Sequence, residues 1–516
     1  MDIQKKPITN KVLWIFAVGQ FGWSLLSGII STWLVHLYTG SADKFLDTNG
    51  IMSQFITQRP LIASITLFGI ITAVGRLFDA VTDPLIASWS DRSNYKGGRR
   101  IPFLKAAAVP FTLLTVAVFV LPRTNSVPTN NTIIFILLML FYLAMTLYCT
   151  PYNALIAELG DTQKNRINVS TFISFTYIAG FSLSTLIPSL ANIFQDGRIH
   201  AILEPIAASK GLSFDELMVL LQGSGETVVK MDEVRTILTA ETLNQVTLAQ
   251  QYGMRCAIGV MAAIACVACL VPALFIQERS YIRSVPVKTP AFSSLLKTFG
   301  NGQFRRFVYA DVIYFFAVTM FQTGLADFET RLMGIPSDNT FTLTVIMTVV
   351  SLALYLPVNK LAPKLGKKTL IITGFFTYAA VFLITALCKQ DGGFVWGLIV
   401  AISAGIPMAI LGILPQACVA DVSELNTLET GEDRSGMFFA ARTFAMKLGQ
   451  ALSMLVYTSV TAKHLINGVE TVSASQYRTV AVVATVTCLI GACLFLLYNE
   501  KMILGRIREL RGTDDI

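Results

Sequence analysis

Histidine and charged side chains are scarce in this 516-residue sequence. Charged residues make up 14% of the chain, and its three histidines (His36, His200 and His464) lie far apart along it. Such scattered histidines form no constellation for metal binding or acid–base catalysis, and the motifs GxSxG, HExxH and the P-loop are absent. The sequence therefore predicts a protein that is not an enzyme and that has no cofactor.

Cysteine gives no disulfide framework. All eight cysteines lie in or at the edges of apolar runs, where pairing of a secreted type is not expected. Cys266 and Cys269 have CxxC spacing, but inside an apolar helix we interpret them as small packing residues rather than a metal or redox site.

Apolar residues dominate what is present. Hydrophobic residues make up 53% of the chain and the mean hydropathy is +0.61, which is typical of an integral membrane protein in contact with the lipid bilayer. The net charge of +8 does not indicate nucleic-acid binding, because the basic residues fall in short segments between apolar runs. The first run, 12–38, is too long for a signal peptide and is interpreted as a retained span.

Twelve apolar windows predict an all-α membrane protein with about 12 transmembrane helices. The windows are 12–38, 61–89, 101–121, 132–158, 167–191, 253–276, 303–330, 340–361, 369–388, 394–420, 436–461 and 477–499. Basic residues collect at the two termini and in the loops after even-numbered windows. By the positive-inside rule, both termini are expected in the cytoplasm of a plasma (inner) membrane protein.

The windows divide into two sets of six. We expect an N-terminal half at 1–276, a cytoplasmic linker at 277–302, a C-terminal half at 303–499 and a cytoplasmic tail at 500–516. A weak internal repeat supports the division, because Gly98-Arg99-Arg100 after the second window resembles Gly366-Lys367-Lys368 after the eighth. Two parallel six-helix halves define the major facilitator fold, in which a solute binds between the halves.

A long hydrophilic segment, about 192–252, is predicted on the outer side. Ser213-Phe-Asp-Glu216 reads as a capping box that opens a short amphipathic helix, and 226–251 reads as a second helical stretch. The segment could shape an entrance or contact a partner. The alternative is a surface insertion that touches no solute.

Two acids one helical turn apart are the most informative feature. Asp79 and Asp83 project from one face of the second window, with Arg76 one turn before Asp79. Charges inside a membrane span cost free energy unless they face water or partners, which is typical of an ion or solute pathway. The acids and the Thr82 hydroxyl suit a small cation such as Na+, and a proton could fill the same role. The alternative is structural, with Arg76 and Asp79 neutralising each other.

Lys447 lies deep inside the eleventh window, far from either end. If the two halves face each other, Lys447 could reach Asp79 and Asp83 and couple cation to solute, and Arg76 is the second expected coupling residue. The alternative is that its ammonium group extends to the membrane surface.

Three motifs give the chain a family resemblance. They are Arg76-Leu-Phe-Asp-Ala-Val-Thr-Asp-Pro84 with Asp91 to Pro102, then Thr150-Pro-Tyr152 with Glu158 to Asp161 and Arg166, and finally Ala420-Asp421 through Arg434 to Lys447. With these motifs the chain resembles the glycoside-pentoside-hexuronide:cation symporters of the major facilitator superfamily, a family that includes the melibiose carrier. The resemblance covers nearly the whole chain except 192–252.

The resemblance implies roles for individual residues. Asp79 and Asp83 match the family's cation-binding acids, Thr82 stands in place of an asparagine ligand, Thr146 matches a threonine ligand, and Lys447 matches a lysine between the cation and sugar sites. The acids that grip a galactoside are missing, and Ser24, Cys149 and Ser174 stand at those positions. Asn153 replaces a stacking tryptophan. The full set of expected solute-binding residues is Gln20, Trp23, Ser24, Cys149, Tyr152, Asn153, Ser174 and Gln322.

Charged residues at the cytoplasmic ends of the helices are expected to form an inner gate, namely Asp91, Arg99, Arg100, Arg166, Glu424 and Arg434. The sequence thus predicts a secondary transporter, functional as a monomer, that imports a sugar, glycoside or hexuronide with Na+ or H+. The alternatives are a passive facilitator, a carrier of a non-sugar or lipid-like solute on the same fold, and a membrane sensor that binds solute without moving it.

Overall fold

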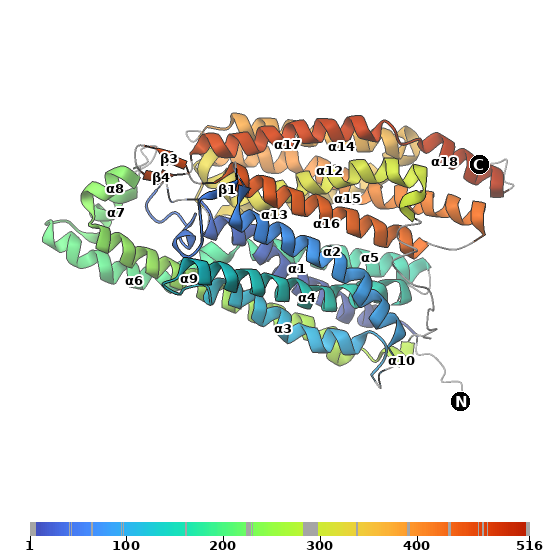
Figure 1. Ribbon diagram of the computed structural model, residues 1–516, viewed down its shortest axis with the longest axis horizontal. Coiled ribbons are helices and arrows are strands. Elements are labelled where there is room, and N and C mark those ends of the chain that lie inside the picture. The colour runs from blue at the N-terminus through green and yellow to red at the C-terminus, as the bar shows by residue number, and fades with distance from the viewer. Residues whose placement is uncertain are drawn as a thin grey trace.

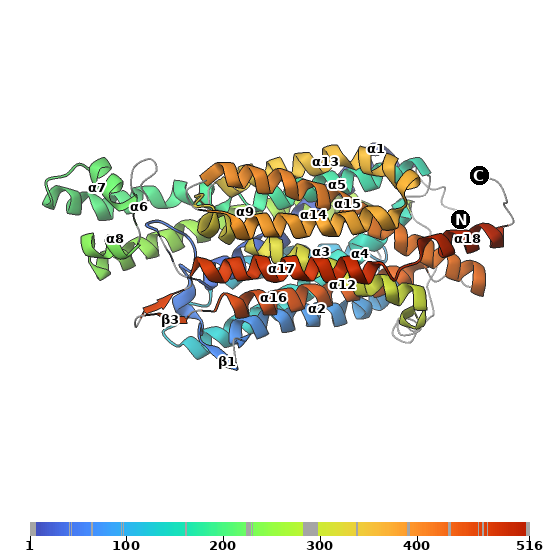
Figure 2. The same ribbon diagram turned by 90° about the horizontal axis from the view of Figure 1, so that it is seen from above.

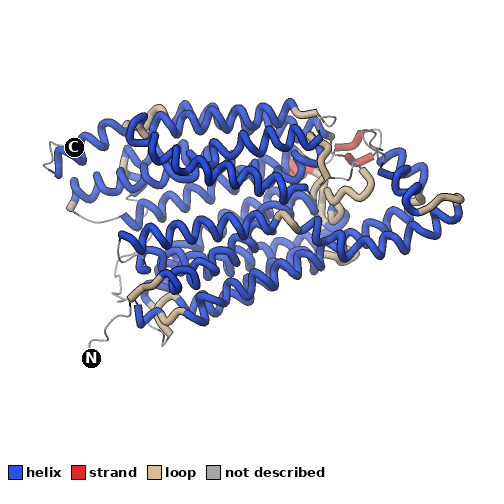
Figure 3. The backbone as a smooth tube through the Cα atoms, turned by 180° about the vertical axis from the view of Figure 1, so that it is seen from behind, coloured by secondary structure: helices blue, strands red, loops and turns tan. Residues whose placement is uncertain are grey.

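Long helices running nearly parallel to one another make up most of the molecule (Figure 1). The computed structural model describes residues 7–40, 42, 44–62, 65–93, 95, 97–159, 163–222, 229, 231–281, 298–336, 339–389, 393–431, 435–462, 464–466, 469–471 and 473–511. Within these described ranges, strands occur only as two short antiparallel pairs, β1 (Pro60–Ile62) with β2 (Ile65–Thr66) and β3 (His464–Ile466) with β4 (Val469–Thr471). The view from behind shows how little of the chain they occupy (Figure 3). The predicted all-α membrane fold is confirmed.

The long helices pack in two groups. The first group contains α1 (Asn10–Tyr38), α2 (Leu67–Arg92), α3 (Ile101–Val120), α4 (Val127–Leu159), α5 (Gln163–Ser184) and α9 (Ala240–Phe275). The second contains α12 (Gly302–Asp327), α13 (Thr340–Leu365), α14 (Lys367–Leu387), α15 (Gly393–Thr430), α16 (Ser435–Val460) and α17 (Ala474–Phe495). The groups touch where α1 packs on α12, α2 on α16 and α5 on α13, so functional side chains on these helices can meet.

Ten helical segments of the described residues are long and apolar enough to cross a membrane. They exclude α2, which carries Asp79 and Asp83, and α16, which carries Lys447. Both of these helices are nevertheless 26 residues long, or about 39 Å at 1.5 Å per residue. Their charged residues therefore have to be satisfied within the bundle.

Three helices extend beyond one end of the bundle and form a cap, defined here as α6 (Ile187–Ser209), α7 (Phe214–Gln222) and α8 (Met231–Ile237). The chain ends lie at the opposite end, called the termini end (Figures 1 and 2). At the cap end lie also β1 to β4 and the short helix η1 (Ser53–Phe55). Buried apolar side chains of α6, α7, α8 and the start of α9 pack together and give the cap a small hydrophobic core of its own.

The capping box predicted at Ser213 is confirmed. Ser213 N donates to Glu216 Oε2 at 2.7 Å, and Glu216 N donates to Ser213 Oγ at 3.2 Å. These bonds to the charged carboxylate lower the pKa of Glu216.

Two helix boundaries differ from the sequence prediction. The fifth window, 167–191, is not one helix, because α5 ends at Ser184 and α6 begins at Ile187, with Pro188 in the first turn, where its missing N–H costs nothing. The stretch 226–251 is also divided. Thr239 caps α9 by accepting a hydrogen bond from Thr242 N at 3.2 Å. Residues 223–228 lie outside the described part.

The internal repeat has a structural counterpart at the termini end. Glu278, which opens α10 (Glu278–Tyr281), accepts hydrogen bonds from the backbone N–H groups of Arg99 and Arg100 at 2.8 Å, just before α3 begins. Glu500, which opens α18 (Glu500–Arg511), accepts the same bonds from Lys367 N at 2.9 Å and Lys368 N at 2.8 Å. A carboxylate therefore caps the same helix position, at the positive end of the helix dipole, in each group. Of the predicted linker, 282–297 lies outside the described residues, as does 512–516 of the tail.

Candidate functional site

Three charged side chains meet where the two helix groups touch. Lys447 Nζ of α16 lies 2.9 Å from Asp79 Oδ2 and 2.5 Å from Asp83 Oδ2, both on α2. Asp79 is completely buried and Lys447 is 6% exposed, whereas the Asp83 side chain is 21% exposed. The ammonium group thus occupies the position between the two carboxylates, and Asp83 is the member of the trio that solvent reaches.

Hydroxyl groups of α4 complete the surroundings of both acids. Thr146 Oγ1 donates to Asp79 Oδ1 at 2.5 Å, and Thr150 Oγ1 donates to Asp83 Oδ1 at 2.8 Å. Each threonine follows its acid by 67 residues. On each of α2 and α4, residues i and i+4 lie on one face. One alignment of the two helices therefore brings Thr146 to Asp79 and Thr150 to Asp83. Thr82 Oγ1 lies 3.4 Å from Thr146 Oγ1 and donates to Asp79 O at 3.1 Å.

Two carboxylates and up to three hydroxyls therefore form an oxygen-rich candidate cation site. Hard cations prefer oxygen ligands of this kind. Thr150 belongs to this set, although the sequence analysis included it only as a motif residue. The signal that could have identified it is the spacing, since Thr146 and Thr150 repeat the i, i+4 interval of Asp79 and Asp83.

Arg76 does not pair with Asp79. Its guanidinium carbon lies 5.1 Å from the centre of the Tyr142 ring, and it makes no hydrogen bond or ion pair within the described part of the chain. Arg76 is only 9% exposed. The structural alternative, in which Arg76 neutralises Asp79, is therefore not the arrangement seen. The buried guanidinium group of Arg76 is left without an anionic partner among the described residues.

A second ion pair fixes α16 to its own group. Arg442 Nε and Nη2 donate to Asp311 Oδ2 and Oδ1 of α12 at 2.9 and 3.1 Å. This two-pronged geometry is rigid. Lys447 is therefore held on a helix anchored in the second group while it contacts the first.

The expected solute-binding residues divide into two sets. Ser24 and Tyr152 are completely buried in the first group, where Tyr152 OH donates to Phe16 O at 2.7 Å and its ring stacks on Phe16. Ser24 Oγ donates to Phe21 O at 3.0 Å. Both occupy helix-packing positions in this conformation.

The other expected solute-binding residues are more accessible. Asn153 and Ser174 are exposed, whereas Trp23, Cys149 and Gln322 are half-buried. Trp23 Nε1 donates to the buried Gln20 Oε1 at 3.0 Å, and its ring meets Tyr177 edge to face at 5.7 Å. Tyr177, which the sequence analysis omitted, therefore lies beside Trp23, one of the expected solute-binding residues.

The predicted inner gate is only partly visible. Arg99 and Arg100 are buried at 8% and 7% exposure, and their backbones contact Glu278 of the same group. Glu424 is half-buried on α15. The side chains of Asp91, Arg166 and Arg434 lie outside the described residues, so their expected role stays a prediction.

A buried polar cluster joins the two groups at the cap end, and the sequence analysis missed it. We call it the outer cluster, made of His36, Asp47, Thr48, Asn49, Asp327, Arg331 and Tyr457. His36 Nδ1 lies 2.5 Å from Asp327 Oδ1, and Asn49 Nδ2 donates to the same oxygen at 2.6 Å. Tyr457 OH donates to Asp327 Oδ2.

Two further contacts complete the outer cluster. Arg331 Nη2 lies 3.3 Å from Asp47 Oδ2, and His36 Nε2 lies 3.0 Å from Thr48 Oγ1. His36, Asp327 and Arg331 are at most 1% exposed. The sequence signal was Asp327, an acid inside the seventh window, followed by Arg331 just beyond its end.

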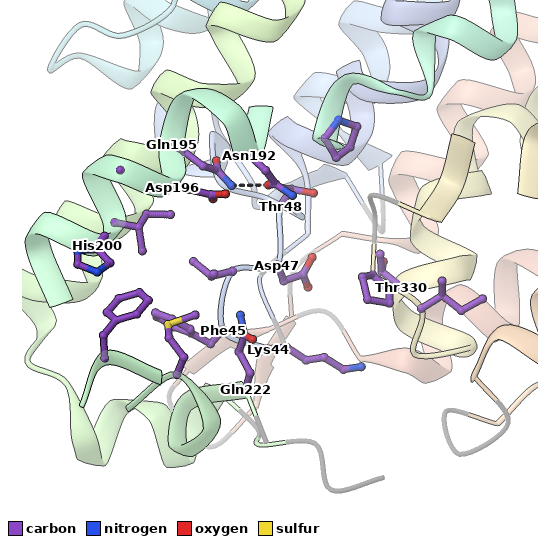
Figure 4. Close-up of a pocket in the computed structure, with 18 of the residues that line it drawn as sticks. Lys44, Phe45, Asp47, Thr48, Asn192, Gln195, Asp196, His200, Gln222 and Thr330 are labelled. Atoms are coloured by element: carbon purple, nitrogen blue, oxygen red, sulfur yellow. Dashed lines mark hydrogen bonds between the residues drawn. The ribbon is translucent and has the colours of Figure 1, made fainter. Parts of the chain in front are cut away.

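A cavity of about 940 Å³ lies beyond the outer cluster, between the cap and the second group (Figure 4). Asp47, Thr48 and Thr330 line it, and the first two also belong to the outer cluster. From the cap, Asn192, Gln195, Asp196 and His200 face the cavity. The outer cluster therefore forms the floor of a large opening at the cap end.

Comparison with known proteins agrees with this architecture. The family model described as MFS/sugar transport protein matches residues 15–507. An uncharacterized symporter of Synechocystis sp. is 24% identical over 88% of this chain and 86% of the relative. The sodium-dependent lysophosphatidylcholine symporter 1-A of Danio rerio is 23% identical over 77% of this chain and 70% of the relative.

Solved structures share the fold. A D-xylose–proton symporter superimposes with a TM-score of 0.58 at 16% identity, over 92% of this chain and 96% of that one. The nucleoside transporter NupG gives 0.56 at 11% identity, over 96% and 99%. These findings support the superfamily in the predicted resemblance, but they do not single out the melibiose carrier. The chain is a multi-pass membrane transporter rather than an enzyme, and it belongs to the MFS/sugar transport protein family.

Proposed function

We propose that the protein is a sodium-coupled symporter that imports a small polar solute by alternating access, with both termini in the cytoplasm. The observation that carries the proposal is the contact of Lys447 with Asp79 and Asp83 across the two helix groups. The names of the relatives, which include sodium-dependent symporters, support the choice of sodium.

The charges of the trio support coupling to one monovalent cation. Two carboxylates and one ammonium group in contact carry a net charge of one negative unit. One sodium ion neutralises that charge and competes with Lys447 for the carboxylate oxygens, while Thr146, Thr150 and Thr82 supply neutral oxygens. Since Lys447 belongs to the other group, its displacement loosens a contact that ties the groups together.

The conformation supports alternating access. The outer cluster joins the two groups at the cap end through His36, Asp327, Asp47 and Arg331. Helices of the two groups diverge toward the termini end (Figure 1). We therefore interpret the structure as the state closed at the cap end, in which the trio is sealed from the outer cavity.

For the solute we propose a glycoside that carries an acidic group, such as a hexuronide. Trp23 and Tyr177 offer aromatic faces, and the half-buried Gln322 offers an amide for hydroxyl groups. The unpaired guanidinium of Arg76 suits a carboxylate. Sodium would remove the net negative charge that repels such a solute, so cation and solute would bind cooperatively.

A lysophospholipid-like amphiphile is the second candidate. It is supported by the relatives from Danio rerio and other vertebrates, whose names state lysophosphatidylcholine as the solute. The buried Arg76 suits a phosphate as well as a carboxylate. The hexuronide and the lysophospholipid differ in their apolar part, because only the lysophospholipid carries an acyl tail that the protein would have to accommodate.

Uptake into proteoliposomes tests both candidates. The panel contains labelled glycosides, hexuronides and lysophospholipids, each with an inward sodium gradient, an inward proton gradient or no gradient. We expect a hexuronide to accumulate only with the sodium gradient. Accumulation of a lysophospholipid would replace the solute assignment, accumulation with the proton gradient would replace the cation, and equilibration without a gradient would indicate a passive facilitator.

A further inference from the structure

Another buried acid, outside the trio, lies on the turn that carries Arg331 of the outer cluster. Glu329 belongs to η2 (Phe328–Leu332), a π-helical turn that continues α12, with Met333 N bonded to Phe328 O at 3.2 Å. Glu329 is only 3% exposed. Single π-turns inside α-helices often occur at functional sites.

The Thr340 hydroxyl of α13 is the one side-chain group among the described residues that stabilises a negative charge on Glu329. Its Oε2 makes no hydrogen bond, and within the described part of the chain Glu329 forms no ion pair. Thr344 Oγ1, one turn after Thr340 on α13, also makes no hydrogen bond with the described residues. A buried polar group without a partner costs free energy unless something binds it.

A small cavity adjoins this carboxyl group. It measures about 10 Å³, close to the volume that one water-sized sphere occupies. Glu329 and Thr344 are its polar lining residues, and the others are apolar, namely Phe321, Leu325, Phe328, Met333, Leu343, Met347, Gly397, Val400 and Ala401. The lining comes from α12, η2, α13 and α15, all of the second group.

The charged groups near this site point elsewhere. Asp327 and Arg331, on either side of Glu329, contact His36 and Asp47 of the first group. The described residues of α13 and α15 that line the cavity carry no charge. Asp338, which precedes α13, lies outside the described residues.

Burial in such apolar surroundings strongly disfavours an ionised carboxylate relative to a protonated one. Sodium requires a shell of oxygen ligands, whereas this lining is mostly apolar. A proton requires no shell. We infer that Glu329 is a second cation-binding site that holds a proton while the outer cluster is closed.

The site is connected to the outer cluster through the backbone. Asp327, Glu329 and Arg331 lie within five residues of one continuous turn. The apolar cavity has room for about one water molecule and its lining carries no positive charge, so full solvation of an ionised Glu329 would require movement of this turn. Proton release from Glu329 should therefore accompany opening at the cap end. The inference rests on the burial of Glu329 and not on the proposed function.

Infrared difference spectroscopy of the purified protein at neutral pH tests the inference. We expect wild type to show the band of a protonated carboxyl group that is absent from Glu329→Gln, with an amplitude of one group per protein. Glu204→Gln, which alters an exposed acid of the cap whose side chain is 66% exposed, should keep the band. Equal spectra for wild type and Glu329→Gln would show that Glu329 is ionised and would overturn the inference.

A sodium series separates the proton from a sodium ion. The band should persist as sodium replaces potassium at constant pH. Loss of the band in wild type as sodium rises would identify a sodium site and overturn the assignment to a proton. Glu329→Gln mimics the protonated side chain in size and charge, so this variant should also fold and remain stable. Its melting temperature checks that the spectra of intact proteins are compared.

Discussion

Lys447 and Asp83 belong to different helix groups, yet Lys447 Nζ lies only 2.5 Å from Asp83 Oδ2. Asp83 is the more exposed of the two acids. An arriving cation would therefore meet Asp83 first and compete there with Lys447. In the proposed mechanism, this contact links sodium binding to the packing of the two helix groups against each other.

The first prediction concerns the charge of the trio. Asp83→Asn leaves Asp79 and Lys447 as a neutral pair, so the attraction for a further cation is lost. We expect no gradient-driven accumulation of solute, with normal expression, and the same result for Asp79→Asn. Uptake into proteoliposomes measures this. If Asp83→Asn still concentrated solute, the acid pair would be structural.

The second prediction concerns Lys447. Lys447→Ala removes the ammonium group that contacts the carboxylates of Asp79 and Asp83. Sodium should still bind these carboxylates, but its binding would no longer displace a side chain of the second helix group. We expect solute exchange to continue while accumulation against a gradient is lost. Lys447→Arg keeps the charge and should keep partial accumulation. Wild-type accumulation by Lys447→Ala would argue against its coupling role.

The third prediction concerns the threonine that bonds Asp83. Thr150→Val removes a hydrogen bond to a charged group, about 1.5–3 kcal/mol, which corresponds to roughly 10- to 100-fold in affinity. We therefore expect sodium affinity to fall by about that factor. Thr132→Val, on the exposed face of the same helix, is the matched control and should leave the affinity unchanged. Equal affinities for the two variants would remove Thr150 from the site.

The fourth prediction concerns the outer cluster. Asp327 accepts hydrogen bonds from Asn49 and Tyr457 and pairs with His36, so Asp327→Asn should weaken closure at the cap end. Spin labels are placed at Asn125, between α3 and α4 of the first group, and at Ser475, in the first turn of α17 of the second group, in a background without the native cysteines. The distance between the two labels should shift toward longer values.

The control for this fourth prediction is Asp196→Asn. Asp196 lines the large cavity and does not belong to the outer cluster, so the distance distribution should stay that of the parent protein. An unchanged distribution in Asp327→Asn would show that the outer cluster does not hold the groups together.

The fifth prediction concerns the turn before α3. Gly98 has a φ of +122°, which disfavours a side chain, and a Cβ there would collide with the Glu278 carboxylate that caps the helix. Gly98→Ala should therefore cost about 1–3 kcal/mol of stability. Thermal unfolding in detergent measures the loss. Gly259→Ala, where a Cβ meets no atom within 4 Å, should be neutral or stabilising.

Local periodicity accounts for what the sequence could predict. The helical period alone places Asp79 and Asp83 on one face, and the i, i+4 spacing of Thr146 and Thr150 is visible as well. Which residues of α2 face which residues of α4 depends on tertiary packing. The sequence alone therefore does not show that Thr146 bonds Asp79 or that Thr150 bonds Asp83. Lys447 was expected near the acids because its window was assigned to the facing half.

Contacts between distant segments account for what the sequence analysis missed. His36 and Asp327 are 291 residues apart in the sequence, and the packing of α1 on α12 brings them together. The mostly apolar surroundings of Glu329 likewise depend on the packing of α13 and α15 around it. Tyr152 shows the opposite case, because an aromatic residue beside a functional motif turned out to pack against Phe16.

Equilibrium binding of radioactive sodium to the purified protein tests the central claim most directly. Wild type should bind about one sodium ion per protein at saturation, since one positive charge neutralises the trio formed by Asp79, Asp83 and Lys447. Asp83→Asn should abolish this binding, and Glu329→Gln should leave it unchanged. Saturable sodium binding that survives in Asp83→Asn would contradict the assignment of the trio as the coupling site.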